Sequence, residues 1–282
     1  MKLGYCTWGM MTVPIEEAVP AIAGIGYTGI EIAVTPGFFT ELTTLDASRR
    51  AMIRQLLDDH DLVLTAVAGH VAMVELDPVA HETNMQRLRG CIDLVADLSN
   101  ASETPTVCSC VRGRPQFFEE RKILLAERVR GIGEYAGARG VVLAIEPHTG
   151  TTLDTPDKVE WLMRQVDHPA VKVNFDISHF DVMGYEIEQC VPQMVPYSVH
   201  THVKDERGRY PDHEFLTPGE GPFDYVRYLR AMDAAGYQGY VMVEVSKMVQ
   251  RRPDYDPFFH AKLAYWTLDK AFKVAGLDRD DV

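Results

Sequence analysis

Four residues that can bind a metal ion lie at the ends of four successive apolar runs in the second half of the chain. Three of the runs end in a carboxylate residue, namely Glu146, Asp176 and Glu244. The fourth run contains His202. Side chains in a strand alternate between its two faces. If the apolar neighbour of each residue faces outward, all four polar side chains face inward. The neighbours that this places outward are Ile145, Phe175, Val203 and Val243.

This convergence predicts a bound divalent cation. Three carboxylates in one cavity repel one another and lose hydration when they are buried. A cation removes both costs, and three carboxylates with one imidazole suit Mn²⁺, Mg²⁺ or Co²⁺ better than a metal that prefers sulfur. We expect Mn²⁺ and keep Zn²⁺ open. The alternative is four separate ion pairs or helix caps, at the ends of four consecutive strands.

The elements that would position these residues are eight strand–helix units. Short runs rich in Val, Ile and Leu, typical of buried parallel strands, alternate with longer amphipathic runs. The predicted strands are Lys2–Cys6, Gly29–Val34, Leu62–Ala68, Thr106–Cys110, Val141–Glu146, Val171–Asp176, Ser198–Lys204 and Gly239–Glu244. The predicted helices are Ile15–Ile25, Ser48–His60, His81–Leu98, Glu119–Ala138, Thr155–Val166, Glu186–Met194, Phe223–Ala235 and Phe258–Ala275.

Eight such units in 282 residues favour a (β/α)₈ TIM barrel, with residues 1–282 as a single domain. The alternative is an open doubly wound sheet, but no GxGxxG follows the first strand, as the dinucleotide-binding version requires. Two long irregular stretches, Asp205–Pro222 and Val245–Pro257, follow the last two strands. In a barrel, the loops after the strands form the active-site face. Trp8, after the first strand, is a candidate flat apolar wall of that site, and a place in the core is the alternative.

Charge and composition narrow the classes of partner and compartment. A net charge of −13 is unfavourable for binding a nucleic-acid backbone, which depends on clustered Lys and Arg. No apolar run is long enough to predict a membrane span, and the beginning of the sequence lacks the apolar run of a signal peptide. Five cysteines without a CxxC spacing fit a reducing compartment. We therefore expect a cytoplasmic protein without nucleic-acid or membrane partners.

The motifs together resemble those of the xylose-isomerase-like barrel superfamily, which includes sugar isomerases, ketose 3-epimerases, inositol-pathway enzymes and endonuclease IV. The resemblance covers the whole chain. It is carried by Glu146-Pro147-His148, Asp176-Ile177-Ser178-His179, His202-Val203-Lys204-Asp205, the Gly219-Glu220-Gly221 turn and Glu244. It implies that Glu146, Asp176, His202 and Glu244 bind one metal ion, with His179 beside it near a substrate hydroxyl.

For the reaction, the resemblance implies an isomerase or epimerase that acts on a sugar- or polyol-derived ketone through an enediolate. Ketose 3-epimerases use the residues matching Glu146 and Glu244 as opposed proton carriers. They also place an arginine six residues after the metal histidine, where this chain has Gly208 between Arg207 and Arg209. We expect both arginines to bind substrate, as we do Trp8, His70, His179 and Lys204.

Two other readings stay open, together with a homo-oligomer or a small partner subunit. His148 occupies a position where xylose isomerase has a lysine, and a similar Glu-x-His occurs in relatives that cleave 3-oxo-glycosides by elimination. A metal-dependent lyase resembling a C-glycoside deglycosidase subunit, with His148 as a catalytic residue, is therefore the alternative. The barrel could also bind a small carbohydrate without catalysis. Endonuclease IV is matched at His70 and Asp176 but needs a histidine near Cys108, which is absent.

Overall fold

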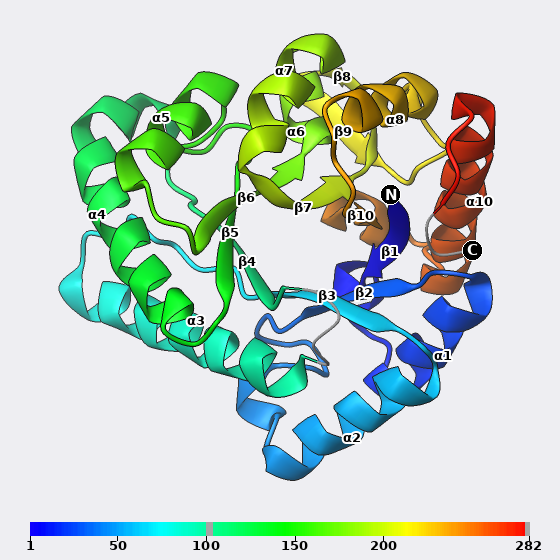
Figure 1. Cartoon of the computed structure of the whole chain (residues 1–282), viewed down its shortest axis with the longest axis horizontal. Coiled ribbons are helices and arrows are strands. Elements are labelled where there is room, and N and C mark those ends of the chain that lie inside the picture. The colour runs from blue at the N-terminus through cyan, green and yellow to red at the C-terminus, as the bar shows by residue number, and fades with distance from the viewer. Residues whose placement is uncertain (100–103, 280–282) are drawn as a thin grey trace.

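The computed structural model describes residues 1–99 and 104–279, and its parallel strands close into a barrel surrounded by helices (Figure 1). The barrel strands are β1 (Lys2–Cys6), β2 (Gly29–Ala33), β3 (Val63–Ala68), β4 (Thr106–Cys110), β5 (Val142–Glu146), β6 (Val171–Asp176), β7 (Ser198–Val203) and β10 (Tyr240–Val243). Each pairs with its neighbours in the order β1-β10-β7-β6-β5-β4-β3-β2. The predicted (β/α)₈ barrel is confirmed.

The helices lie outside the barrel and follow the strands in alternation. They are α1 (Ile15–Ile25), α2 (Ala47–Asp59), α3 (Pro78–Leu98), α4 (Phe118–Gly137), α5 (Pro156–Val166), α6 (Ile177–Asp181), α7 (Ile187–Met194), α8 (Tyr225–Ala234), α9 (Lys247–Gln250) and α10 (Pro257–Ala275). Helix α3 begins earlier than expected because Asp77 caps it and Pro78 occupies its first turn. Among the described residues, no helix combines the length and apolar character needed to cross a membrane.

The strands bury their two faces differently. Ile145, Phe175, Val203 and Val243 belong to the large apolar core between strands and helices, as their strand positions predicted. Inside the barrel, the small side chains of Ala66, Cys108 and Ala144 form a separate cluster. Small residues on the inner face leave room for the larger polar side chains above them.

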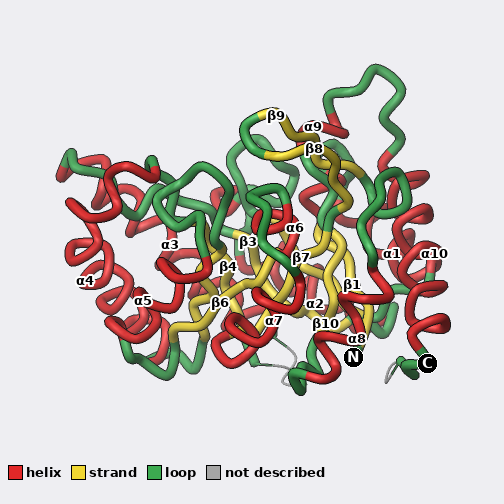
Figure 2. Tube along the Cα trace, turned by 90° about the horizontal axis from the view of Figure 1, so that it is seen from above, coloured by secondary structure: helices red, strands yellow, loops and turns green. Residues whose placement is uncertain are grey.

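The two long stretches after the last strands are more ordered than the sequence indicated. The first contains an antiparallel hairpin of β8 (Asp205–Arg209) and β9 (Asp212–Leu216), and the second contains the short helix α9. Figure 2 shows the hairpin and α9 on the same side of the barrel. The prediction of irregular loops was wrong here, because the charged residues of the hairpin hid its alternation.

Asp205 holds the rest of the loop after β9. Its carboxylate accepts backbone hydrogen bonds from Glu206 (3.1 Å), Gly219 (3.0 Å), Gly221 (3.0 Å) and Phe223 (3.1 Å). Gly219 has a φ of +103°, which disfavours L side chains, and a Cβ on Gly221 would collide with the Asp205 carboxylate. The Gly-Glu-Gly turn is therefore shaped around one buried aspartate.

Candidate active site

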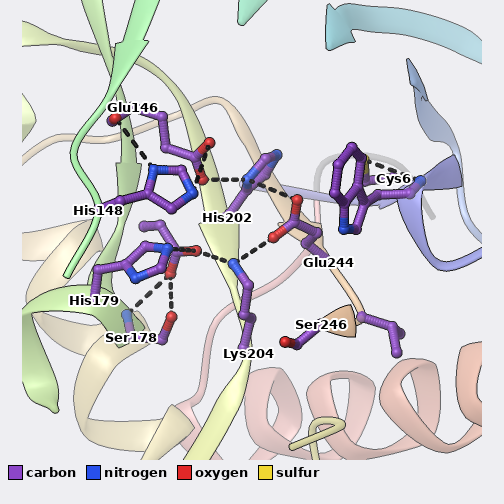
Figure 3. Close-up of polar contacts among 12 residues, drawn as sticks. Cys6, Glu146, His148, Ser178, His179, His202, Lys204, Glu244 and Ser246 are labelled. Carbon is purple, nitrogen blue, oxygen red and sulfur yellow. Dashed lines mark hydrogen bonds and ion pairs between the residues drawn. The ribbon is translucent and has the colours of Figure 1, made fainter. Parts of the chain in front are cut away.

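Glu146, Asp176, His202 and Glu244 meet at the carboxyl ends of β5, β6, β7 and β10. Each offers a ligand atom, and these atoms all lie within 4.8 Å of one another. The Nδ1 atom of His202 lies 3.0 Å from Oε1 of Glu146 and 3.9 Å from Oε1 of Glu244. Glu146 and Glu244 approach His202 from different sides (Figure 3). All four side chains are buried.

A buried carboxylate orients the imidazole of this group from below. Glu31, on β2, accepts hydrogen bonds through Oε2 from Nε2 of His202 at 2.6 Å and from Nε2 of His200 at 2.8 Å. Because Nε2 faces Glu31, Nδ1 is the nitrogen that faces Glu146 and Glu244. A carboxylate behind a ligating histidine is the usual way in which proteins fix the tautomer and direction of the ring.

The pKa values of two carboxylates of the site, Glu146 and Asp176, lie below their ordinary values. Burial alone would raise the pKa of Glu146, but His148 and His202 hold that pKa well below its usual value. Burial likewise acts against Asp176, whose pKa is nevertheless lowered, chiefly by the Lys204 ammonium and by His179. Lys204 forms ion pairs with both Asp176 and Glu244, which raise its pKa against the effect of burial.

The donor set fits a divalent cation. The Oε2 atom of Glu146 is buried and has no hydrogen-bond partner among the described residues, although its carboxylate is ionised. An unpaired buried carboxylate oxygen is costly, and a cation beside it removes that cost. Three carboxylates and one imidazole are ligands that a hard or borderline divalent metal accepts.

Two histidines lie next to the four candidate metal ligands. The rings of His148 and His179 have centroids 4.2 Å apart, and Nε2 of His148 lies 3.7 Å from Oε2 of Glu146. The backbone N–H of Thr149 donates to Nδ1 of His179, so the neutral ring carries its proton on Nε2, 3.6 Å from Asp176. Burial, followed by the proximity of His148, lowers the pKa of His179 well below its usual value. His179 is therefore a neutral hydrogen-bond donor.

A cavity of about 420 Å³ opens above this group. Its lining combines predicted residues with others that the sequence did not single out. The predicted ones are Trp8, His70, His148, His179, Lys204 and Glu244; the additional ones are Cys110, Arg112, Thr151, Phe215, Ser246, Lys247, Met248 and Arg251. Trp8, His70, His148 and His179 follow one another as neighbouring rings, and Phe215 of β9 packs edge-on against His179 at 5.0 Å. A small cyclic or linear polyol fits this volume.

Arg207 and Arg209, predicted to bind substrate, do not line the cavity. Both are exposed on the β8–β9 hairpin, where Arg207 pairs with Glu214 and Arg209 with Asp181. The charged residues missed at the rim, Arg112, Lys247 and Arg251, come from the loops after β4 and β10. The order of strands alone does not single out loop positions, although Arg112 lies only two residues after the predicted fourth strand.

The family model named xylose isomerase-like TIM barrel matches residues 19–257 of the chain, and the protein belongs to this family. The name of the family agrees with the closed barrel described above. The predicted superfamily is confirmed.

Among curated proteins, the chain is similar to two bacterial inosose dehydratases. It is 25% identical to that of Salmonella typhimurium over 262 residues, which span 87% of this chain and 77% of the relative. It is 24% identical to that of Geobacillus thermodenitrificans over 183 residues, 60% of this chain and 61% of the relative. Among solved structures, D-psicose 3-epimerase from Clostridium cellulolyticum H10 has a TM-score of 0.78 at 18% identity, covering 98% of this chain and 99% of that one. The likeness to the epimerase structure shows the shared fold.

Proposed function

We propose that the protein is a divalent-metal-dependent isomerase or epimerase that removes a proton from the carbon next to a ketone in a small sugar- or polyol-derived substrate. The observation that carries the proposal is the group of Glu146, Asp176, His202 and Glu244 within 4.8 Å, beneath a cavity of about 420 Å³. A sugar-binding protein without catalysis has no need of this many buried charges. Mn²⁺ is the metal that we propose.

The metal, held by these four residues, would polarise the ketone and stabilise charge on its oxygen. Glu146 and Glu244 reach the site from different sides, so one carboxylate can take the proton and the other can return one on the opposite face. Glu146 would bind the metal through one carboxylate oxygen and leave the other as the base, and Oε2 of Glu244 lies against the Lys204 ammonium. Proton return to the other face gives an epimer; return to the neighbouring carbon gives an isomer.

The residues around the carboxylates bind and orient the substrate. His179 presents an N–H toward the site and can donate to a hydroxyl or to the developing enediolate oxygen, where a positioned donor is most effective. Lys204 contributes a buried positive charge on the same side. Trp8 provides a flat apolar wall at the cavity, suited to the C–H face of a sugar ring.

A second candidate function, elimination, is favoured by His148. Its Nε2 lies 3.7 Å from Oε2 of Glu146, and its ring lines the cavity, where it can reach a substrate proton or a leaving hydroxyl. The dehydratase names of the two sequence relatives support this candidate. Both reactions begin with removal of the proton next to the ketone. In epimerisation the enediolate takes up a proton again, whereas in elimination it expels a hydroxyl or an aglycone from the next carbon, which leaves as water or as an alcohol with the help of a general acid.

The test uses the metal-loaded protein in D₂O with ketohexoses, inososes and 3-oxo-glucosides, followed by NMR. Deuterium incorporation at one carbon, with isomer or epimer formed, supports the main proposal. Loss of water or of an aglycone assigns the second candidate instead. Glu146→Gln with intact metal binding is the matched variant, since it keeps the shape of the side chain and removes its basicity. No exchange and no elimination with any substrate in metal-loaded protein would contradict both.

A further inference from the structure

The rim of the cavity carries positive charges that no catalytic step described above uses. Arg112, Lys247 and Arg251 all line the cavity, and all three are exposed. Within residues 1–99 and 104–279, none of them has a carboxylate within ion-pair distance. Glu244 is the one carboxylate among the described residues that line the cavity, and it already forms an ion pair with Lys204.

The chain has 41 acidic and 28 basic residues, so most basic side chains could find a carboxylate partner. Three cations that have none among the described residues, at the rim of a single cavity, are therefore unexpected. Neighbouring arginines find partners: Arg252 binds Glu220 at 2.8 Å and Arg207 binds Glu214 at 2.6 Å. A net charge of −13 repels an anionic ligand at long range, and a local group of unpaired cations reverses that field at the mouth of the cavity.

Two of the cations are placed as a pair. Lys247 and Arg251 are separated by four residues across α9 and its end, a spacing that puts both side chains on one face. The Lys247 ammonium lies 4.6 Å from the centre of the Trp8 ring, at the wall proposed for the sugar. Lys247 is also three residues beyond Glu244, and both line the same cavity.

Arg112 faces this pair from across the barrel. It follows β4, which lies four strands away from β10 in the closed order, and both loops line the one cavity. Its φ of +62° is unusual for a residue with a long side chain. A residue kept in such a conformation at the mouth of a site points to use of its side chain.

We propose, on the basis of the function proposed above, that the substrate carries an anionic group, a carboxylate or a phosphate, that Lys247 and Arg251 bind. Arg112 adds positive charge from the opposite wall. The ketone end of the substrate then lies over Glu146 and Glu244, and the apolar face of the carbon chain lies against Trp8. This assigns the rim as the part of the site that selects anionic over neutral ketoses.

The test compares three matched probes, D-fructose, D-fructuronate and D-fructose 6-phosphate, by calorimetric titration into the metal-loaded protein. We expect one of the two anionic probes to bind at least tenfold more tightly than D-fructose, since hydrogen bonds to charged groups are the stronger ones. The double variant Lys247→Gln/Arg251→Gln should lose that preference and bind the anionic probes no more tightly than D-fructose. Lys262→Gln/Lys270→Gln on α10 removes the same charge away from the cavity and should keep the preference.

Equal binding of neutral and anionic probes by the wild type would overturn the proposal, as would a preference that the rim variant retains. Melting curves identify a misfolded variant, and Arg112→Gln then provides an independent reduction of the preference. Which anion binds more tightly separates a sugar acid from a sugar phosphate. Proton exchange on neutral ketoses without any anion preference would refute the rim site alone. Rim-dependent anion binding without exchange or elimination on any substrate would refute the proposed function alone.

Discussion

Glu206 on β8 offers a quantitative test of the electrostatics beside the site. Its side chain is 2% exposed, and neither carboxylate oxygen has a hydrogen-bond partner among the described residues. Burial, then the nearby Asp181, Asp205 and Asp176 carboxylates, raises the pKa of Glu206 to about 10. The group is therefore neutral in the folded protein at pH 7, whereas it ionises near its ordinary pKa of about 4.3 in the unfolded chain.

The sign and the magnitude of the effect follow from that difference. Because the folded state holds a proton that the unfolded state releases, this group favours folding most below about pH 4.3. Its contribution falls as the pH rises toward 10, by about 1.4 kcal/mol per pH unit. Glu206→Gln keeps the size and neutrality of the side chain and removes the titration. Between pH 5 and pH 8 the variant should therefore gain about 4 kcal/mol in unfolding free energy relative to the wild type.

Urea unfolding of both proteins at pH 5, 6, 7 and 8, with chelator present, measures this gain. Chelator is needed because a cation beside Asp176 would stabilise the ionised form of Glu206. Glu127→Gln, an exposed glutamate on α4, is the control and should show no comparable trend. A stability difference between Glu206→Gln and wild type that stays constant from pH 5 to pH 8 would refute the reasoning and show that Glu206 ionises normally.

Three further predictions concern the metal and the reaction. Asp176→Asn should lose the metal. Chelation should lower the melting temperature of the wild type, since a ligand at a hundredfold excess over Kd adds about 2.7 kcal/mol to the free energy of unfolding. Full metal occupancy of the variant by elemental analysis, or a melting curve that metal removal leaves unchanged, would argue against the site. Glu31→Gln should weaken Mn²⁺ binding about ten- to hundredfold in a titration, because His202 loses its orienting carboxylate; unchanged affinity would leave Glu31 a purely structural role. His148→Ala should reduce turnover modestly and keep proton exchange, whereas a loss of about 10²–10⁴-fold would make it the general base of an eliminating enzyme.

The barrel and the candidate metal-binding group could be predicted from the sequence because both depend on local periodicity. Glu146, Asp176, His202 and Glu244 lie at strand ends, where alternation decides which way a side chain points and the closed barrel brings the ends together. The same rule placed Lys204 on the inner face. These residues could be predicted without knowing which strands lie opposite each other in the barrel.

Other features of the site depend on pairings between distant segments, which local patterns do not reveal. The bond from Glu31 to His202 joins residues 171 positions apart across the barrel. Arg112, in the loop after β4, and Lys247, at the start of the short helix α9 after β10, line the same cavity although they are 135 positions apart in the chain. Arg207 and Arg209 illustrate the converse: they lie outside the cavity, where Arg207 pairs with Glu214 of the hairpin and Arg209 with Asp181 of α6.

The way Asp205 gathers the loop also determines how the protein resists proteases. Arg207 and Arg209 are exposed, and trypsin cleaves after arginine. To cleave there, however, a protease must bind several residues of the chain in an extended form in its own active site. Four backbone N–H groups bound to one carboxylate, together with the β8–β9 pairing, must separate before that can happen. Cleavage at this hairpin then proceeds at a rate set by the small population of molecules in which the loop is open. A single aspartate beneath the loop thus contributes to the lifetime of the whole chain.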